Sequence, residues 1–336
     1  MESTVIYEVR DHNLMNNSGK ICVLVVLLCV CGSAIAQSYP TQSIRIIVPY
    51  PSGGGTDISA RVVGQKMTEA LGQQIIVDNR SGASGNIAME IAARTAPDGY
   101  TLIMSTVGQM AMNPAMFSSL PFDPQNDFTP VALVSSTVFA LVVHPDVPAK
   151  SVKELIALAK AQPGKLTYAS SGMGGTSHVA TELFQLMAGI KMMHVPYKGG
   201  SSIYPDLFSG RVSMLLADVI AIKQYVASDK LLALGVTSAR RSAVMPEVPT
   251  IAEAGVPGYE TTSWNVLLAP AGTPRAIIDR LNAAIVRVLP LPEVAERLAG
   301  DGSEFGKNTP EQVSAFLRAE QAKWAKVIQA TNIKMD

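Results

Sequence analysis

Residues 44–61 read Ile-Arg-Ile-Ile-Val-Pro-Tyr-Pro-Ser-Gly-Gly-Gly-Thr-Asp-Ile-Ser-Ala-Arg, and this stretch predicts the fold. The β-branched run from Ile44 to Val48 is typical of a buried parallel strand, and two prolines end it because they cannot donate ladder hydrogen bonds. Three glycines then permit a sharp turn with a bare backbone, and Thr56 is a suitable cap for a following helix. Such a helix start has unpaired N–H groups at a partially positive end. The stretch therefore predicts a site for an anion, which we interpret as a carboxylate.

The order of strand, glycine-rich loop and helix recurs along the chain. Strands or apolar runs are expected at 44–48, 74–78, 101–105, 131–135, 139–144, 167–171, 192–197, 212–216, 230–237 and 262–269. Helices are expected at 56–71, 86–95, 151–161, from the 172–178 loop to 187, and at 203–208, 274–288, 293–300 and 309–328. Residues 106–114 and 246–259 are expected to be loops. This alternation predicts an α/β protein with parallel sheets.

A chain of 336 residues predicts two domains, at about 100–200 residues each. The first is predicted to comprise 38–139 plus 262–336 and the second 140–261, with one crossing near Ser136 to Ala140 and a return at 262–269. Val48-Pro-Tyr-Pro-Ser-Gly-Gly and Val195-Pro-Tyr-Lys-Gly-Gly repeat the same pattern in the two domains. Ligands of open α/β sheets bind outside the carboxyl ends of the strands. Two such ends facing each other predict a cleft lined with backbone donors.

The charge balance limits the partners. The chain has 27 basic and 27 acidic side chains, so its formal net charge is zero. A nucleic-acid partner is excluded because it normally requires a basic excess. An anionic ligand must therefore be held by local dipoles rather than by the field of the whole protein.

The N-terminus predicts a cleaved secretion signal over residues 1–36. Lys20 precedes an apolar segment that is shorter than the roughly 20 residues of a membrane span, and Ala34-Ile-Ala36 has the small-x-small pattern of a cleavage site. Met15 is the more usual start for such a signal, so residues 1–14 are interpreted as an upstream-start artefact. Lipid attachment at Cys31 is the open alternative, which the bulky Val30 before it disfavours.

All three cysteines, Cys22, Cys29 and Cys31, lie in this signal. The mature chain is therefore expected to have no disulfide, thiolate metal site or cysteine nucleophile. His144, His178 and His194 lack metal-ligand spacing, and neither a nucleophile elbow nor a phosphate loop is complete. No catalytic residue, metal or cofactor is expected.

From Tyr39 to its end the sequence resembles the Bug family, the extracytoplasmic substrate-binding proteins of tripartite tricarboxylate transporters. The residues that carry the resemblance are Tyr39-Pro, Ile47-Val-Pro-Tyr-Pro-Ser-Gly-Gly-Gly-Thr-Asp, Asp78-Asn-Arg-Ser-Gly-Ala-Ser-Gly-Asn, Pro97-Asp-Gly-Tyr-Thr-Leu, Gly172-Met-Gly-Gly-Thr-Ser-His-Val-Ala-Thr-Glu-Leu-Phe, Val195-Pro-Tyr-Lys-Gly-Gly and Pro249-Thr-Ile-Ala-Glu-Ala-Gly. Two departures are Ser52, where many members carry alanine, and Ile203-Tyr-Pro, whose bulky Tyr204 replaces a small residue.

The resemblance implies an α/β, two-lobed periplasmic binding fold of type II, with two crossovers, that closes like a Venus flytrap on a small carboxylate. Family ligands are di- and tricarboxylates, acidic amino acids, aromatic acids and nicotinate-like compounds. The implied partner is a two-component membrane permease, and the implied state is a periplasmic monomer.

Three amide sites follow from the residues and the family pattern together. The first amide site is Gly54, Gly55 and Thr56, the second is Ser84, Gly85 and Asn86, and the third is Gly174, Gly175, Thr176 and Ser177. Tyr50 and Tyr197 are expected to pack on the carbon skeleton of the ligand. Asp57 is expected to be a partner of the helix dipole, and Asp218 an acceptor for a ligand amine or water. The loop residues Thr106, Ser171, Gly199 and Gly200 complete the predicted site.

Two alternatives stay open. An exported hydrolase or isomerase using the same cleft would employ His178 or Asp57 as a base. A receptor that feeds a signalling partner would have the same sequence features as one that feeds a transporter.

Overall fold

The computed structural model describes residues 39–197, 200–298 and 309–335. The predicted signal with its three cysteines, and the predicted site residue Gly199, lie outside these ranges. The chain divides into two compact units, Met1–Thr41 and Gln42–Asp336, and both sheets belong to the second unit.

The second unit alternates strands with helices. The strands are β1 (Ile44–Val48), β2 (Ile75–Asn79), β3 (Thr101–Thr106), β4 (Phe128–Thr137), β5 (Phe139–Val143), β6 (Thr167–Ser170), β7 (Met193–Pro196), β8 (Met214–Asp218), β9 (Leu232–Val236) and β10 (Ser263–Pro270). The helices are α2 (Gly55–Leu71), α3 (Asn86–Ala93), α4 (Asn113–Met116), α5 (Val152–Ala161), α6 (Thr176–Ala188), α7 (Tyr204–Phe208), α8 (Val219–Ala227), α9 (Arg275–Val288), α10 (Pro292–Leu298) and α11 (Pro310–Thr331). Short turns of other helix types are η1 (Ala83–Gly85), η2 (Gly108–Met112) and η3 (Gly200–Ile203).

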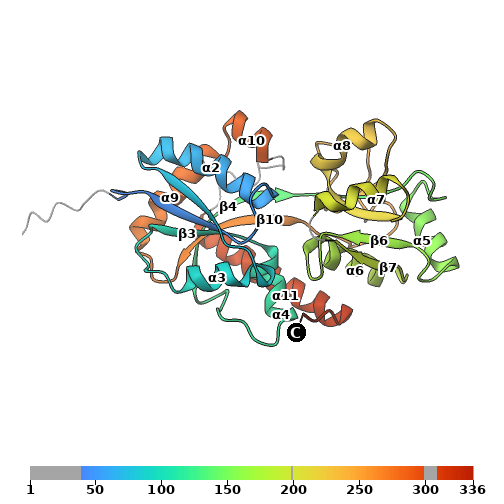
Figure 1. Cartoon of the computed structure of the whole chain (residues 1–336), viewed down its shortest axis with the longest axis horizontal. Helices are drawn as coiled ribbons and strands as arrows, with labels where there is room; N and C mark the ends of the chain where they lie inside the picture. The colour runs from blue at the N-terminus through green and yellow to red at the C-terminus, as the bar shows by residue number, and fades with distance from the viewer. Residues whose placement is uncertain (1–38, 198–199, 299–308, 336) are drawn as a thin grey trace, which may run out of the picture. The chain divides into compact units, whose positions relative to one another are not determined.

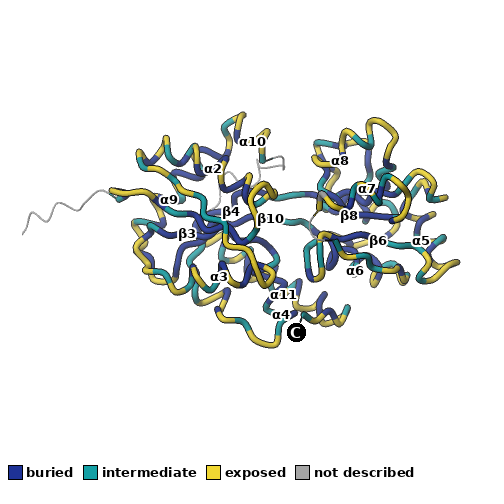
Figure 2. Tube along the Cα trace, viewed as in Figure 1, coloured by how far each residue is buried: buried dark blue, intermediate teal, exposed yellow. Residues whose placement is uncertain are grey.

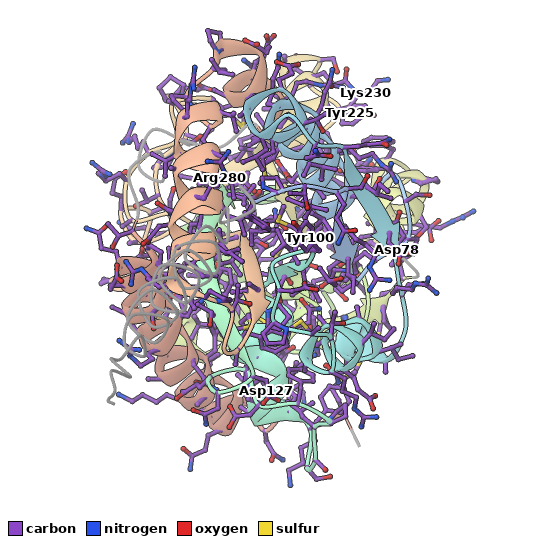
Figure 3. All side chains as sticks on the ribbon, turned by 90° about the vertical axis from the view of Figure 1, so that its left-hand side faces the viewer. Asp78, Tyr100, Asp127, Tyr225, Lys230 and Arg280 are labelled. Carbon is purple, nitrogen blue, oxygen red and sulfur yellow. The ribbon has the colours of Figure 1, made fainter. Side chains whose placement is uncertain are left out.

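The first sheet has the strand order β2-β1-β3-β10-β4. β1 runs parallel to β2 and β3, whereas β10 runs antiparallel to both β3 and β4. The sheet is therefore mixed: β2, β1 and β3 form the predicted parallel pairs, and β10 adds antiparallel ones. Helices α2 and α9 cover one face and α3 and α11 the other (Figure 1). Figure 3 labels Asp78, which lies in the edge strand β2. Asp78 forms ion pairs with Arg45 and Arg80.

The second sheet has the order β7-β6-β8-β5-β9. β6 is parallel to β7 and β8, and β5 is antiparallel to β8 and β9, so this sheet is mixed as well. One face packs against α7 and α8 and the other against α5 and α6 (Figure 1). The carboxyl ends of the parallel strands β6 and β8 lie on the same side of the sheet, and α6 and α8 begin there.

The chain passes between the sheets twice. Only Val138 separates β4 in the first sheet from β5 in the second, and the return runs from β9 to β10. These crossings follow the pattern that the sequence predicts. The domain limits at 139/140 and 261/262 stay a prediction, because residues 42–336 form one compact unit.

The cores are aliphatic, and the strands form their buried centre (Figure 2). Trp264 in β10 and Trp324 in α11 are fully buried, and both indole N–H groups donate to Glu320, over 3.0 and 3.1 Å. Val179 of α6 belongs to the same cluster as Trp324. The helix that begins at the third amide site is thus packed against elements of the first sheet.

Three local predictions were wrong or incomplete. Most of the segment 106–114, which was expected to be a loop, is helical: Thr106 ends β3, and η2 and α4 follow over residues 108–116, where Met110, Met112 and Met116 pack into the core beside α11. Helix α8 was not predicted, and Asp218 caps it by accepting the N–H of Ile220 over 2.9 Å. At α5, Ser151-Val-Lys-Glu has the spacing that predicts a capping box. Ser151 does cap the helix, but Glu154 accepts the N–H of Lys150 instead of that of Ser151.

Thr309-Pro-Glu-Gln predicts a capped helix start with proline at the first helical position, and the start of α11 confirms it. Thr309 and Gln312 form a reciprocal capping box, with Pro310 in the first turn. Among the described residues, no helix has the length and apolar character needed to cross a membrane.

Candidate ligand-binding site

The first amide site lies at the start of α2. Gly54, not Thr56, is the cap residue, with φ of −81° and ψ of 166°, and no side chain caps the helix. The earlier expectation that Thr56 caps the helix was wrong, because the helix begins one residue before it. Within the described ranges, the amides of Gly55 and Thr56 have no hydrogen-bond acceptor. These two N–H groups are therefore available to an anion.

Asp57 holds the loop before α2 in place. Its Oδ2 accepts from the Gly53 N–H over 2.9 Å and from Arg61 Nε over 3.0 Å, while Oδ1 accepts from Asn79 Nδ2 over 2.9 Å. Burial by itself raises the pKa of Asp57, but the hydrogen bonds from Arg61, Gly53 and Asn79 outweigh it and lower that pKa below its usual value. All these contacts stabilise the protein's own loop, in line with a structural carboxylate.

A polar network joins the ends of β1 and β3. Tyr50 Oη lies 3.2 Å from Thr106 Oγ1, and Gln109 Nε2 donates to Tyr50 Oη over 2.9 Å. Gln109 Oε1 accepts from the hydroxyl and the N–H of Thr106, over 2.8 and 3.1 Å. The structure thus brings together the predicted residues Tyr50 and Thr106, which are adjacent because β1 and β3 are parallel neighbours.

The same network supports the second amide site. Gln109 Nε2 also donates to the carbonyl of Ser84 over 2.8 Å, and Asn113 Nδ2 donates to Asn86 Oδ1 over 2.6 Å. Ser84 and Gly85 have positive φ values of 55° and 89°. A Cβ added at Gly85 would lie 2.4 Å from Gln109 Nε2, so only glycine fits there. The N–H of Gly85 is already bonded to the Gly82 carbonyl over 2.9 Å.

Gln109, Asn113 and Asn265 are polar residues of this region that the sequence analysis missed. Gln109 and Asn113 lie in the segment that was expected to be a loop. Asn265 lies opposite Thr106 in the β3–β10 pair and donates to Ser135 Oγ over 2.8 Å. Its Oδ1 is buried and has no hydrogen-bond donor among the described residues. Asn265 could have been identified from the sequence, because it is the polar residue in the otherwise apolar run Trp264-Asn-Val-Leu-Leu.

The third amide site is smaller than predicted. The N–H of Gly174 donates to His178 Nδ1 over 3.0 Å, and the N–H of Gly175 donates to the Gly172 carbonyl over 3.3 Å. These two predicted donors are already used within the chain. Gly175 caps α6 without a side-chain bond, and the amides of Thr176 and Ser177 have no acceptor among the described residues. Ser171 is adjacent, since its N–H donates to Ser177 Oγ over 3.3 Å.

The other second-sheet candidates have internal partners. Tyr197 donates from its hydroxyl to Asp206 over 2.8 Å, and burial, followed by this bond, raises its pKa to about 12. Asp218 caps α8, and burial raises its pKa. Tyr204 packs against Phe208 and Tyr225 on the edge of the core, and Gly200 begins η3.

The loop of the third amide site also touches the first sheet's elements. A Cβ at Gly174 would lie 3.0 Å from Met335 Sδ and 3.3 Å from Met116 Cε. Cavities of about 180 and 280 Å³ lie elsewhere, beside α11, and no predicted site residue lines them. The first is bounded mainly by residues 124–130 and the second by the η2–α4 segment. The glycine-rich loops, not these cavities, hold the amides suited to an anion.

Two mixed α/β sheets that the chain crosses between twice, with glycine-capped helix starts at the ends of parallel strands, define a periplasmic binding protein of type II. The chain belongs to the Bug family, because the family model "Tripartite tricarboxylate transporter family receptor" matches residues 59–333. This confirms the family that the sequence motifs indicated.

Relatives cover nearly the whole chain. A UPF0065 protein of the tcbD-tcbE intergenic region of Pseudomonas sp. strain P51 is 37% identical over 318 residues, which is 93% of this chain and 94% of the relative. Protein BugT of Bordetella pertussis is 35% identical over 325 residues, or 96% of this chain and 100% of BugT.

Solved structures agree with this assignment. Rpa4515 of R. palustris, solved with adipate, has a TM-score of 0.79 and 38% identity, covering 88% of this chain and 99% of Rpa4515. MatC of Rhodopseudomonas palustris, solved with bound malate, has a TM-score of 0.77 and 30% identity, covering 86% and 100% of the two chains.

Proposed function

We propose that this protein is a periplasmic receptor that captures a small carboxylate for a tripartite tricarboxylate transporter. One observation carries the proposal: α2 and α6 both begin at glycine caps, and their leading amides have no acceptor in the described chain. The structures solved with adipate and malate support a carboxylate as the ligand.

The amide sites are strong enough for this role. One helix N-terminus favours an anion by about 0.3–1 kcal/mol, and by up to about 2 kcal/mol when partly buried. Hydrogen bonds to a charged group contribute roughly 1.5–3 kcal/mol each. A few such bonds from Gly55, Thr56, Thr176 and Ser177 reach the roughly −8 kcal/mol of a micromolar complex. No arginine is needed.

Asn265 adds a polar group near the first and second amide sites. Its buried Oδ1 lacks a donor, and a buried acceptor without a partner costs about 1–3 kcal/mol. A ligand hydroxyl, a ligand amine or a bridging water would satisfy it. We include Asn265 with Tyr50 and Thr106 as the polar rim of the proposed site.

The hydrogen bonds of the two candidate bases, His178 and Asp57, favour a receptor over an exported enzyme. His178 Nδ1 already accepts the Gly174 N–H, and Asp57 is held by Arg61, Asn79 and Gly53. Neither group is free to remove a proton from a substrate. Family membership points the same way, since the matched family is one of transporter receptors.

The remaining assignments follow from the proposed role. The protein is exported by a signal over residues 1–36, and the liganded form is presented to a two-component membrane permease. Closure is a hinge motion at the two crossings, near Val138 and before β10, driven by a ligand that contacts amides of both sheets. The lobes then correspond to 38–139 plus 262–336 and 140–261.

The test compares two added carboxylates at helix starts. Gly55→Asp places an internal anion at the first amide site, where a Cβ has open space. Ser151→Asp places one at the start of α5; because β5 is antiparallel to β8, that helix starts at the opposite sheet edge. Thermal shift and calorimetry with adipate, malate, glutamate, benzoate and nicotinate measure binding, and NMR of the acids detects turnover.

We expect at least one acid to stabilise the wild type without being consumed. Gly55→Asp should abolish that stabilisation and Ser151→Asp should retain it. Equal binding by Gly55→Asp would remove the first amide site from the proposal. Consumption of an acid would instead favour the enzyme.

A further inference from the structure

Two histidines lie stacked beneath the loop of the third amide site. The ring centroids of His178, in the first turn of α6, and His194, in β7, are 4.1 Å apart with planes 8° from parallel. The ring centroid of Tyr168, in β6, lies 4.7 Å from that of His194 and 6.4 Å from that of His178, with all three planes within 14° of parallel. In the sequence, both histidines lack metal-ligand spacing, and His178 is a candidate base only in the enzyme alternative.

Both imidazoles are tied to the loop that leads into α6. His178 Nδ1 accepts the N–H of Gly174 over 3.0 Å. His194 Nε2 lies 2.6 Å from Ser170 Oγ, and Ser170 Oγ donates to the Gly172 carbonyl over 3.0 Å. The loop before Thr176 is thus held at two points, Gly172 and Gly174.

These contacts fix the protonation of each ring. Because an N–H donates to His178 Nδ1, that nitrogen must carry a lone pair, and a neutral ring then has its proton on Nε2. Because the Ser170 proton is used on the Gly172 carbonyl, His194 Nε2 is the donor to Ser170 Oγ. Protonating His178 would place a second N–H against that of Gly174 and break the bond.

We propose that His178 is a positioning residue for the third amide site, whose neutral imidazole holds Gly174 so that the amides of Thr176 and Ser177 face the ligand, and whose protonation weakens binding. This inference rests on the proposed carboxylate-binding function. Under this proposal, low pH weakens ligand binding by protonating His178, a residue that does not contact the ligand.

The surroundings of His178 keep it neutral near pH 7. Burial lowers its pKa to about 4, and burial, followed by the charge of His178, lowers that of His194 to about 4 as well. The titratable groups that face the pair are Tyr168 and Glu182, which are bonded to each other. On α11, which packs against α6, the buried Glu320 accepts the indole N–H groups of Trp264 and Trp324.

The experiment uses two substitutions of His178. His178→Asn places an amide oxygen near the position of Nδ1 and keeps an acceptor that does not titrate. His178→Phe keeps a flat ring and has no acceptor. His144→Asn is the control, because His144 lies at the end of β5 and bonds to Asp146. The probe is the tightest binder among adipate, malate, benzoate and nicotinate, measured by calorimetry from pH 7 to pH 3.

At pH 7 we expect His178→Asn to bind within about threefold of the wild type and His178→Phe about tenfold more weakly, the cost of one buried hydrogen bond. Because only the neutral form is competent, wild-type affinity should fall about twofold relative to His178→Asn at pH 4, and about tenfold at pH 3. Titration of the ligand acid affects both proteins equally, so it cancels in the ratio of wild-type affinity to His178→Asn affinity. A ratio that stays constant from pH 7 to pH 3, or unchanged binding by His178→Phe, would overturn the proposal.

NMR on the unliganded wild type tests the contact independently of any ligand. The amide signal of Gly174 should titrate together with the ring signals of His178, and a saturating acid should lower the His178 pKa by linkage. A Gly174 signal that ignores His178 would overturn the proposal even if every variant folds. If no acid binds, the proposed function fails, while this titration still decides whether His178 holds the loop.

Discussion

Gln109 Nε2 donates to the hydroxyl of Tyr50 over 2.9 Å, although the two residues are 59 positions apart. The same side chain bonds to Thr106 and to the carbonyl of Ser84. One buried amide therefore sets the relative positions of the loops after β1 and β3 and the turn before α3. The geometry of the first and second amide sites depends on a residue whose hydrogen-bonding capacity is used within the protein.

Gln109→Leu should weaken acid binding and lower the free energy of unfolding by about 1–3 kcal/mol, because it leaves buried polar partners unsatisfied. Calorimetry and urea unfolding measure the two effects. Gln125→Leu is the control, since Gln125 is exposed and bonds to Gln321. If the two variants behave alike, the network does not organise the site.

Gly85→Ala and Gly72→Ala separate backbone strain from steric contact. Both glycines have positive φ, 89° and 70°, so each alanine should cost about 1–2 kcal/mol in strain. Only at Gly85 does the new Cβ collide with Gln109, whereas at Gly72 nothing lies within 4 Å. Gly85→Ala should therefore lose more stability in urea unfolding and also lose acid affinity. Equal losses would show that the collision is relieved at no cost.

Asp57→Asn should destabilise the protein by about 1.5–3 kcal/mol at pH 7, since one amide cannot accept from Arg61, Gly53 and Asn79 together. The pKa of Asp57 is lowered in the folded state, so its contribution is present above the usual value of 3.8 and is lost as the pH falls through the folded value. The difference from the wild type in urea unfolding should thus shrink as the pH falls below 3.8.

Asp98→Asn is the matched control for Asp57→Asn. Asp98 is exposed and accepts the N–H of Tyr100 over 2.9 Å, a bond that asparagine can also make. Its effect should be small at every pH. A pH-independent cost at position 57 would mean that its charge is not what stabilises the loop.

Acid should destabilise the unliganded protein through His178. Its pKa is about 4 in the folded state against the usual 6.5, so the unfolded chain binds a proton first as the pH falls. The free energy of unfolding should fall between pH 6.5 and pH 4, by on the order of 2 kcal/mol from this residue. His178→Asn should reduce that slope, as urea unfolding measured at each pH would show. Identical slopes in the wild type and His178→Asn would contradict this prediction.

The sequence determined the order of elements because local patterns specify them. The aliphatic run Ile44 to Val48 became β1, the glycine run became the bare start of α2, and Thr309 with Gln312 became the capping box of α11. The two crossings were also predictable, since the apolar runs around Val138 and in 262–269 interrupt the regular alternation. Family membership followed from motifs that are continuous in the chain.

Tertiary structure alone decided which groups are free to bind. The amide of Gly174 is taken by His178, and the caps are Gly54 and Gly175, which no local pattern distinguishes from their neighbours. Residues 108–116 are helical because Met110, Met112 and Met116 pack in a core that includes residues of α11, about 200 residues later in the chain. Tertiary structure also decided that β10 in the first sheet and β5 in the second run antiparallel to their neighbours. Local sequence sets where an element begins, but hydrogen bonds and packing between distant segments set which of its donors remain for a ligand.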